Sequence, residues 1–445
     1  MKNKTNKQFL AFSLIIILNF VGLTIGQVKN PTKKSVKKSK VPVVLIHGIG
    51  GSNLRQPQIS QRTKNRGFLG DGGFPNDVRI LWSGNPRNLQ FTSRGEPRTD
   101  TLSKTVIADG FYDVPGKNII HLSEYFIKQK GYKEGSTLFE FAYDFRYSVN
   151  YNADKLGDFI QKIKTAMNVQ QVDIVGHSMG GMIAKAYLSD EANAANVRTL
   201  VFVGTPHLGA PKALKVLRYG DDLGVKLLDE CKVKRASHNY PSMYNLLPGK
   251  RYFEVAKSGY FFDDDDLDSD NIRGLLDFEQ TLNNLKKGIE KECQLKEIDV
   301  MKGDEAMALN TLNNEMVERD TIKFHESLDN WKKPASVTVF NIVGYGVETI
   351  ESIRESGGKI TFNETTEGDG TVPLWSAETV EADAVYYVNL GKFKTEHSEM
   401  IGDKNINLQI SKLLEKGANI YITETSNTRP TSVRFSKKSR VLKIK

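Results

Sequence analysis

The sequence has only two cysteines, Cys231 and Cys293, among 445 residues. One disulfide bond is therefore the most that the chain can form, and the spacing of the two cysteines matches no metal-binding or redox motif. The sequence also lacks a repeat at a fixed period, which argues against a solenoid or a propeller. Its content of 39% hydrophobic residues is too high for a generally disordered chain. One large globular domain with insertions, or two domains, fits these limits.

Acidic residues are absent from both ends of the chain. Residues 1–40 contain nine lysines and account for the whole formal net charge of +9. Residues 426–445 carry seven further lysines and arginines, with short edge strands predicted at Val433–Phe435 and Val441–Ile444. The body between these ends is acidic, which argues against a nucleic-acid partner. The basic ends either tether the protein to anionic surfaces or only solubilise it.

The N-terminus has the layout of a secretory signal peptide. A lysine-bearing start is followed by an apolar run from Leu10 to Ile25 and by the small residue Gly26, so we expect residues 1–26 to be removed. The alternative is an uncleaved anchor, because sixteen residues are near the lower limit for spanning a bilayer. Residues 27–40 form a basic linker. The sequence thus predicts a secreted, periplasmic or cell-envelope protein, in which the two cysteines form a disulfide or remain buried thiols.

Strand-like and helix-like segments alternate in the body of the chain. Val41–Ile46 is a continuous apolar run, typical of a strand buried on both faces of a parallel sheet. Further strands are predicted at Leu138–Tyr143, Val172–Val175, Thr199–Val203, Ser336–Val343, Lys359–Phe362 and Ala384–Leu390. Apolar residues at helical spacing predict helices at Ala153–Met167 (with Asn152 as its N-cap), Gly180–Leu188 and Asn405–Glu415. This order predicts an α/β fold with a mostly parallel sheet covered by helices.

The alternation lapses in two places. Residues 54–118 form a glycine- and arginine-rich insertion in the first part of the core (41–209), and residues 210–334 form a cap before the second part (335–425). A basic tail follows at 426–445. The acidic run Asp263–Asp270 in the cap lacks the spaced ligands of a calcium loop. We therefore expect a solvated loop there, no metal site and no cofactor.

The segment Gly176-His177-Ser178-Met179-Gly180 lies between a predicted strand and a predicted helix. In this context a serine occupies a sharp strand-to-helix turn, and the glycines let backbone segments pass where a Cβ would clash. The turn exposes the serine hydroxyl above the edge of the sheet. Ser178 is therefore the candidate nucleophile.

A serine nucleophile needs a base, and the base needs an orienting acid. Among seven histidines, only His397 lies between the last predicted strand and the last helix, where α/β-hydrolases carry the base. His177 adjoins Ser178 on the turn, and we expect its side chain to point elsewhere. Asp369, placed between two glycines, is the candidate acid; its rivals are Glu364, Glu367 and Asp383.

The negative charge that develops on the substrate needs two backbone N–H donors. Met179, directly after the nucleophile, is expected to supply one. Ile49, in the glycine-rich turn after the first predicted strand, is expected to supply the other. His47, in the same turn, is expected to have a structural role.

At these residues the chain resembles the lecithin:cholesterol acyltransferase family of α/β-hydrolases. The resemblance rests on His397 and on the motifs PVVLIHGIGGSNL (42–54), FAYDFRYS (141–148), VDIVGHSMGGMIA (172–184), GTPHLGAPKAL (204–214) and GDGTVPLWSA (368–377). It implies the α/β-hydrolase fold with a cap, and lipid esters as substrates whose acyl group passes to water or to an alcohol. The competing hypotheses are a carboxylesterase for small soluble esters and a non-catalytic, surface-binding protein of the same fold.

A group of large apolar residues follows the turn that contains Ile49. Its members are Phe68, Leu69, Phe74, Leu81 and Trp82. If they are exposed, they insert into a membrane or lipid-particle surface; if they are buried, they belong to an ordinary core. Unchanged vesicle binding by a variant with Phe68→Ser and Trp82→Ser would argue against insertion.

Overall fold

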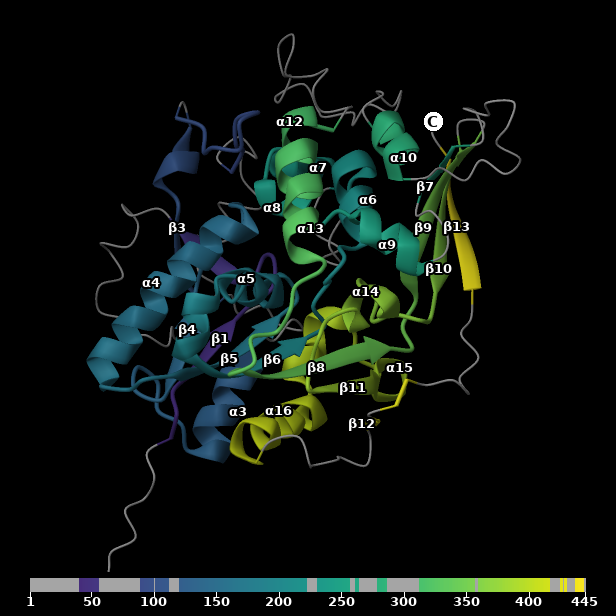
Figure 1. Ribbon diagram of the computed structural model, residues 1–445. Helices are drawn as coiled ribbons and strands as arrows, with labels where there is room; N and C mark the ends of the chain where they lie inside the picture. The colour runs from purple at the N-terminus through teal and green to yellow at the C-terminus, as the bar shows by residue number, and fades with distance from the viewer. Residues whose placement is uncertain are drawn as a thin grey trace, which may run out of the picture. The chain divides into compact units, whose positions relative to one another are not determined.

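A mostly parallel, seven-stranded sheet lies at the centre of the computed structural model (Figure 1). The structure describes residues 40–55, 89–99, 101–111, 120–221, 230–256, 261–263, 278–285, 312–356, 359–416, 425–426, 428–429 and 437–443. In spatial order the strands are β12 (Thr425–Ser426), β11 (Ala384–Asn389), β8 (Thr338–Tyr345), β6 (Val197–Val203), β5 (Val172–His177), β1 (Val43–Ile46) and β4 (Leu138–Phe141). All neighbours pair in parallel except β12, which is antiparallel to β11.

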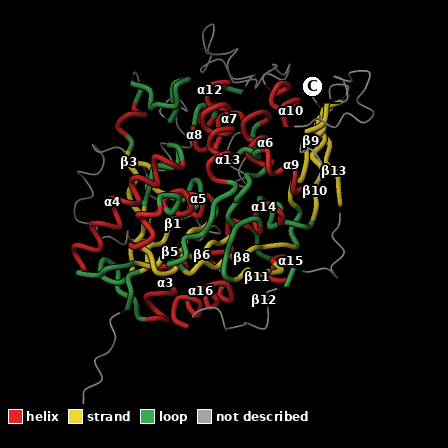
Figure 2. The backbone as a smooth tube through the Cα atoms, in the orientation of Figure 1, coloured by secondary structure: helices red, strands yellow, loops and turns green. Residues whose placement is uncertain are grey.

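Helices cover both faces of this sheet (Figure 2). α4 (Val149–Met167) and α5 (Met179–Tyr187) lie on one face, and α3 (Ile120–Lys130) and α16 (Lys404–Lys416) on the other. Because side chains alternate along a strand, Val44 and Ile46 of β1 join the core beneath α4 and α5, whereas Val43 and Leu45 join the core beneath α3 and α16. Burial on both faces explains why β1 is a continuous apolar run.

The remaining elements belong to the two parts of the core, the two insertions and the tail. They are β2 (Ser52–Arg55), η3 (Leu102–Thr105), β3 (Ile107–Phe111), η4 (Glu191–Asn196), α6 (Pro211–Tyr219), α7 (Glu230–Ser237), α8 (Pro241–Asn245), α9 (Lys250–Ala256), β7 (Phe261–Asp263), α10 (Phe278–Leu285), α12 (Asn314–Met316), η6 (Val317–Ile322), α13 (Lys323–Leu328), β9 (Thr349–Ser356), β10 (Lys359–Thr365), α14 (Leu374–Glu378), α15 (Leu390–Phe393), η7 (His397–Gly402) and β13 (Lys437–Lys443).

Helix α4 starts four residues before the predicted Ala153. Ser148, rather than Asn152, is the N-cap, and its hydroxyl accepts a hydrogen bond from the N–H of Tyr151 at 3.2 Å. The Asn152 side chain is buried and donates to the carbonyl of Asp144 at 3.1 Å. Asn152 therefore fastens the helix to the loop after β4 instead of capping it.

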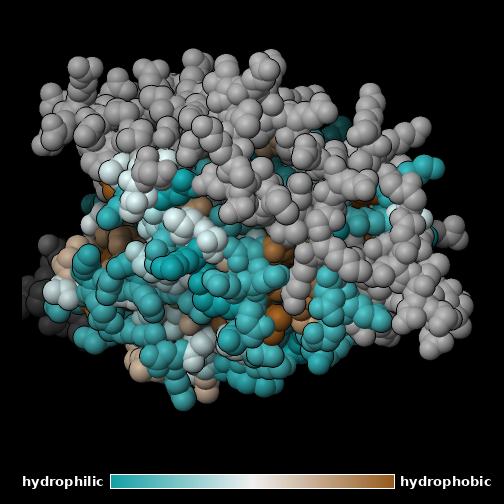
Figure 3. Space-filling model, turned by 90° about the horizontal axis from the view of Figure 1, so that it is seen from above, coloured by the Kyte–Doolittle hydropathy of each residue, from teal (hydrophilic) through white to brown (hydrophobic). Residues whose placement is uncertain are grey.

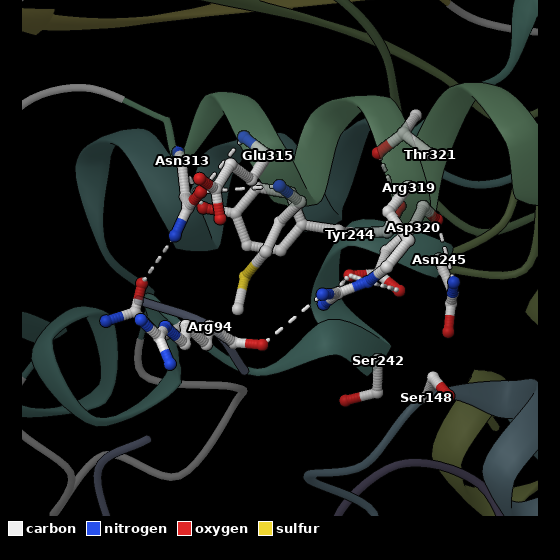
Figure 4. Close-up of polar contacts among 12 residues, drawn as sticks. Arg94, Ser148, Ser242, Tyr244, Asn245, Asn313, Glu315, Arg319, Asp320 and Thr321 are labelled. Atoms are coloured by element: carbon white, nitrogen blue, oxygen red, sulfur yellow. Dashed lines mark hydrogen bonds and ion pairs between the residues drawn. The ribbon is translucent and has the colours of Figure 1, made fainter. Parts of the chain in front are cut away.

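The described part of the cap is hydrogen-bonded to the core at the start of α4 and to the first insertion (Figure 4). The Asn245 side chain on α8 accepts from the N–H of Val149 at 2.8 Å and donates to the carbonyl of Asp320 at 2.7 Å. Asp320 belongs to η6, a π-helical turn between α12 and α13. The Arg319 side chain, beside it, donates to the carbonyl of Arg94 in the first insertion at 3.3 Å. One asparagine thus links the cap to α4, the helix that packs against α5.

A second sheet, with the order β13-β10-β9-β7, accounts for the predicted strand at Lys359–Phe362. That segment is part of β10, which pairs with β9 and β13 in antiparallel fashion and does not enter the central sheet. β13 pairs with β10 along seven residues and overlaps the strand predicted at Val441–Ile444. The strand predicted at Val433–Phe435 lies outside the described residues. Part of the basic tail is therefore a strand of the folded body.

The tail is also joined to the core by Arg429. Its guanidinium forms ion pairs with Glu378, at 3.0 Å, and with Glu367. The Arg429 side chain is 41% exposed, so solvent screening limits these pairs to about 0.5–1 kcal/mol. We predict that Arg429→Met lowers the melting temperature by on the order of 1–2 °C. In a double-mutant cycle, Glu378→Gln should lower the melting temperature less in the Arg429→Met background than in the wild type.

The measurement for this cycle is thermal unfolding followed by circular dichroism. Lys404→Met, which removes an exposed cation on α16, is the matched control and should leave the melting temperature unchanged. Strict additivity of Arg429→Met and Glu378→Gln would show that the pair contributes nothing.

No helix in the described part of the chain is long and apolar enough to cross a membrane. The predicted signal peptide and all of the predicted linker except Lys40 lie outside the described residues, as do the five predicted lipid-interface residues. Where the chain is described, its exposed large hydrophobic side chains are Ile107 on β3 and Tyr151 on α4. Seen from above, the described surface is largely hydrophilic, with small apolar areas between polar ones (Figure 3).

Candidate active site

Ser178 occupies the turn between β5 and α5 with φ 54° and ψ −127°. This conformation is strained for a residue with a side chain, and the neighbouring glycines make room for it. A Cβ on Gly180 would lie 2.4 Å from the carbonyl oxygen of His47, and one on Gly181 would lie 1.9 Å from Thr205 Oγ1. Glycine is therefore required at both positions for α5 to start this close to β1 and β6.

Ser178, His397 and Asp369 form a chain of hydrogen bonds. His397 Nε2 lies 2.9 Å from Ser178 Oγ, and His397 Nδ1 lies 2.7 Å from Asp369 Oδ2. The three side chains are buried, with Asp369 fully enclosed and the other two less than a tenth exposed. They come from the turn after β5, from η7 after β11 and α15, and from the loop between β10 and α14. The structure thus brings together the three residues that the sequence nominates.

The carboxylate of Asp369 is fixed by its own loop. Asp369 Oδ1 accepts hydrogen bonds from the N–H groups of Thr371, at 3.0 Å, and Val372, at 2.7 Å. Gly370, with φ 97°, permits the tight turn that aims these two groups back at the carboxylate. Oδ2 is left to face the imidazole of His397. The loop therefore orients the acid before any substrate binds.

The three rival acids have other partners. Glu367 pairs with Arg429. Asp383 accepts from the N–H of Val339 at 2.8 Å and pairs with Lys333 at 3.2 Å. Glu364 is a buried residue of β10, in the second sheet. Asp369 is the acid that the structure places against His397.

Gly204 is a part of the site that sequence reasoning missed. It has φ 57°, and a Cβ there would lie 3.3 Å from both Asp369 Oδ2 and His397 Nδ1. The backbone after β6 therefore packs directly against the pair formed by the acid and the base. The only signal in the sequence was a glycine at the start of the GTPHLGAPKAL motif. The sequence does not indicate its close contact with Asp369 and His397, which lie 165 and 193 positions later.

The turn that contains Ile49 lies against the nucleophile. A Cβ on Gly48 would lie 2.8 Å from Ser178 Cβ, so this turn and the buried Met179 at the start of α5 flank the serine. His47 Nδ1 donates to the carbonyl of Gly48 at 2.6 Å, and its ring stacks on Tyr143 with centroids 4.1 Å apart. Burial lowers the pKa of His47 to about 3. A neutral, fully packed imidazole here shapes the turn.

The ring of His177 makes a contact that the sequence did not predict. Its Nε2 lies 2.9 Å from the main-chain oxygen of His397. The expectation that His177 points away from Ser178 considered the path of the strand alone. It could not include η7, which returns to His177 from 220 residues further along the chain.

Two other predicted features lie wholly or partly beyond the described residues. Cys231, on α7, is disulfide-bonded, and its predicted partner Cys293 is not among the described residues. The acidic run is described only at Asp263. Within the described ranges, no three His, Cys, Asp or Glu side chains are grouped so that they could hold a metal ion.

A family model and several known proteins match the chain. A family model described as lecithin:cholesterol acyltransferase matches residues 92–381, a range that includes Ser178 and Asp369. The chain is 27% identical to Phospholipase A(1) LCAT3 of Arabidopsis thaliana over 82% of its length and 88% of that protein. It is 22% identical to lecithin-cholesterol acyltransferase-like 4 of the same plant, over 84% of its length and 76% of that protein.

A solved structure supports the fold. A chain in the crystal structure of the Tle4–Tli4 complex superimposes with a TM-score of 0.56 and 12% identity, covering 85% of this chain and 99% of that one. At this identity the likeness concerns the fold alone. The mostly parallel sheet, with helices on both faces, is that of the α/β-hydrolases. The chain belongs to the lecithin:cholesterol acyltransferase family and is an enzyme of carboxylic ester chemistry, an ester hydrolase or a lipid O-acyltransferase.

Proposed function

We propose that the protein is a secreted serine enzyme that cleaves the acyl esters of lipids through an acyl-enzyme on Ser178. The observation that carries the proposal is the hydrogen-bonded chain from Ser178 Oγ through His397 to Asp369. This arrangement is the one that activates a serine hydroxyl for acyl transfer. Secretion is proposed from the signal-peptide pattern of residues 1–26.

Each residue has a defined role in the proposed reaction. His397 Nε2 removes the proton of Ser178 Oγ as the oxygen attacks the ester carbonyl, and Asp369 stabilises the imidazolium that forms. The N–H groups of Ile49 and Met179 donate to the oxyanion, and one such donor contributes about 3 kcal/mol to catalysis in other serine hydrolases. Collapse of the intermediate releases the substrate's alcohol, which takes the proton from His397. The acyl group remains on Ser178.

The second half of the reaction passes the acyl group to water or to another alcohol. The two plant relatives are named for these two outcomes, one as a phospholipase A(1) and the other as acyltransferase-like. In both cases His397 deprotonates the acceptor, so the same three residues serve hydrolysis and transfer. We propose glycerophospholipids as the substrate class.

A fluorophosphonate probe tests the proposed nucleophile. It should label the wild-type protein at Ser178 and leave Ser178→Ala unlabelled, because the probe reacts with an activated serine and not with alanine. Mass spectrometry of the labelled peptide gives the position. Absence of label on the wild type, or equal label on Ser178→Ala, would remove the basis of the proposal.

Product analysis tests the substrate class and the acceptor. With vesicles of a mixed-chain phospholipid, we expect a free fatty acid and a lysophospholipid. If the enzyme also transfers acyl groups to alcohols, adding a long-chain alcohol should convert a fraction of the released acyl groups into a new ester. The rate should rise steeply once a short-chain phospholipid exceeds its micelle threshold. A rate that shows no such rise, with fast cleavage of small soluble esters, would favour a carboxylesterase instead.

A further inference from the structure

His177 directly precedes Ser178, and its ring reaches the base. Nε2 lies 2.9 Å from the main-chain oxygen of His397, and the two imidazole centroids are 5.0 Å apart. The His177 side chain is buried. Because a carbonyl oxygen can only accept a hydrogen bond, Nε2 of His177 carries a proton and donates it.

The ring of His177 is neutral, and this bond fixes its tautomer. Burial lowers the pKa of His177 to about 3, and the nearby His397 lowers it as well. The single ring proton is therefore the one on Nε2. Nδ1 has no hydrogen-bond partner within the described part of the chain, and it faces the turn before Ile49, where a Cβ on Gly48 would lie 3.3 Å away.

The main chain of His397 is held on both sides. Its N–H donates to the carbonyl of Asp369 at 2.8 Å, and its own carbonyl accepts from His177. The ring is held separately by Asp369 Oδ2. Asp369 thus fixes the amide and the imidazole of the base, and His177 fixes the carbonyl.

We propose that His177 is a positioning residue that couples the nucleophile to the base. It is bonded covalently to Ser178 and by a hydrogen bond to the main chain of His397, so it sets the separation between Ser178 Oγ and His397 Nε2. The inference rests on the proposed function, because it concerns how well the serine is activated. His177 touches neither reacting atom through its ring nitrogens; it acts through the position of His397.

Three substitutions separate the hydrogen bond from the volume of the ring. His177→Leu removes the donor, and we expect kcat and the rate constant for fluorophosphonate labelling to fall roughly 10- to 100-fold, since an ångström-scale misplacement can cost about 100-fold. KM should change little, because the bond is internal to the protein. His177→Gln places an amide nitrogen near the position of Nε2 and should restore most of the rate. His177→Asn, the matched control, has an amide too short to reach and should resemble His177→Leu.

The rates are expressed per reactive serine, counted by titration to completion with the probe, so that misfolded protein does not contribute. The inference is overturned if His177→Gln does not restore the rate that is lost in His177→Leu, or if His177→Asn reacts as fast as His177→Gln. It is also overturned if the substitutions change the melting temperature and leave the rates unchanged. These outcomes are distinct from failure of the proposed function. If the proposed function fails, Ser178 of the wild-type protein does not react with the probe.

Discussion

Ser178→Ala and His397→Ala should each lower kcat for ester cleavage by about 10⁶-fold, and the double variant should be no slower than either single one. The reason is that nucleophile and base act as one unit, joined here by a 2.9 Å hydrogen bond. Without the base the hydroxyl is a poor nucleophile, and without the hydroxyl the base has no proton to remove. A residual rate over the uncatalysed reaction should remain, because the turn with Ile49 and the start of α5 are intact in all three variants.

The measurement is kcat for hydrolysis of a chromogenic acyl ester, after purification that excludes carry-over of wild-type enzyme. The melting temperature of each variant serves as the control for folding. If the fold-losses in kcat of the two single variants multiply in the double variant, the two residues act independently. That result would contradict the proposed mechanism.

Much of the central sheet could be predicted because its strands are buried on both faces. Such a strand reads as a continuous apolar run, as β1 does. The strands predicted for β4, β5, β6, β8 and β11 also lie within a few residues of the observed ones. Site residues at the ends of these strands could be predicted for a related reason. The order of the chain around the sheet determines which loops meet at one edge. Once the motif Gly176–Gly180 had given Ser178, the position of His397 followed from chain order.

The second sheet could be predicted only in part. β9 has only two large apolar residues, Ile350 and Ile353, three positions apart instead of alternating, and it packs on α6 and on β10, which the sequence alone does not place. β13 is rich in basic residues and was predicted only in part, as a short edge strand of the tail. Its pairing with β10 depends on a contact made more than 70 positions away. Contacts of this kind, like that of Gly204 with the acid and base, are set by tertiary packing rather than by a local pattern.

The choice of Asp369 over its rivals is the prediction with the next largest effect. Asp369→Asn should lower kcat by about 10⁴-fold, because an amide in place of the carboxylate favours the wrong tautomer of His397 and cannot stabilise the imidazolium. The substitution is nearly isosteric, and the amide oxygen can still accept hydrogen bonds from the N–H groups of Thr371 and Val372. The loop should therefore keep its shape while the chemistry is lost.

Two matched variants make this prediction specific. Glu367→Gln and Asp383→Asn remove carboxylates of the same region whose partners are Arg429 and Lys333 rather than the base. We expect kcat to stay close to that of the wild type in both, with at most a small loss of thermal stability, because surface pairs contribute about 1 kcal/mol or less. A loss near 10⁴-fold in either of them, with Asp369→Asn active, would transfer the role of the acid to that residue. The hydrogen bond of 2.7 Å between Asp369 Oδ2 and His397 Nδ1 would then be structural rather than catalytic.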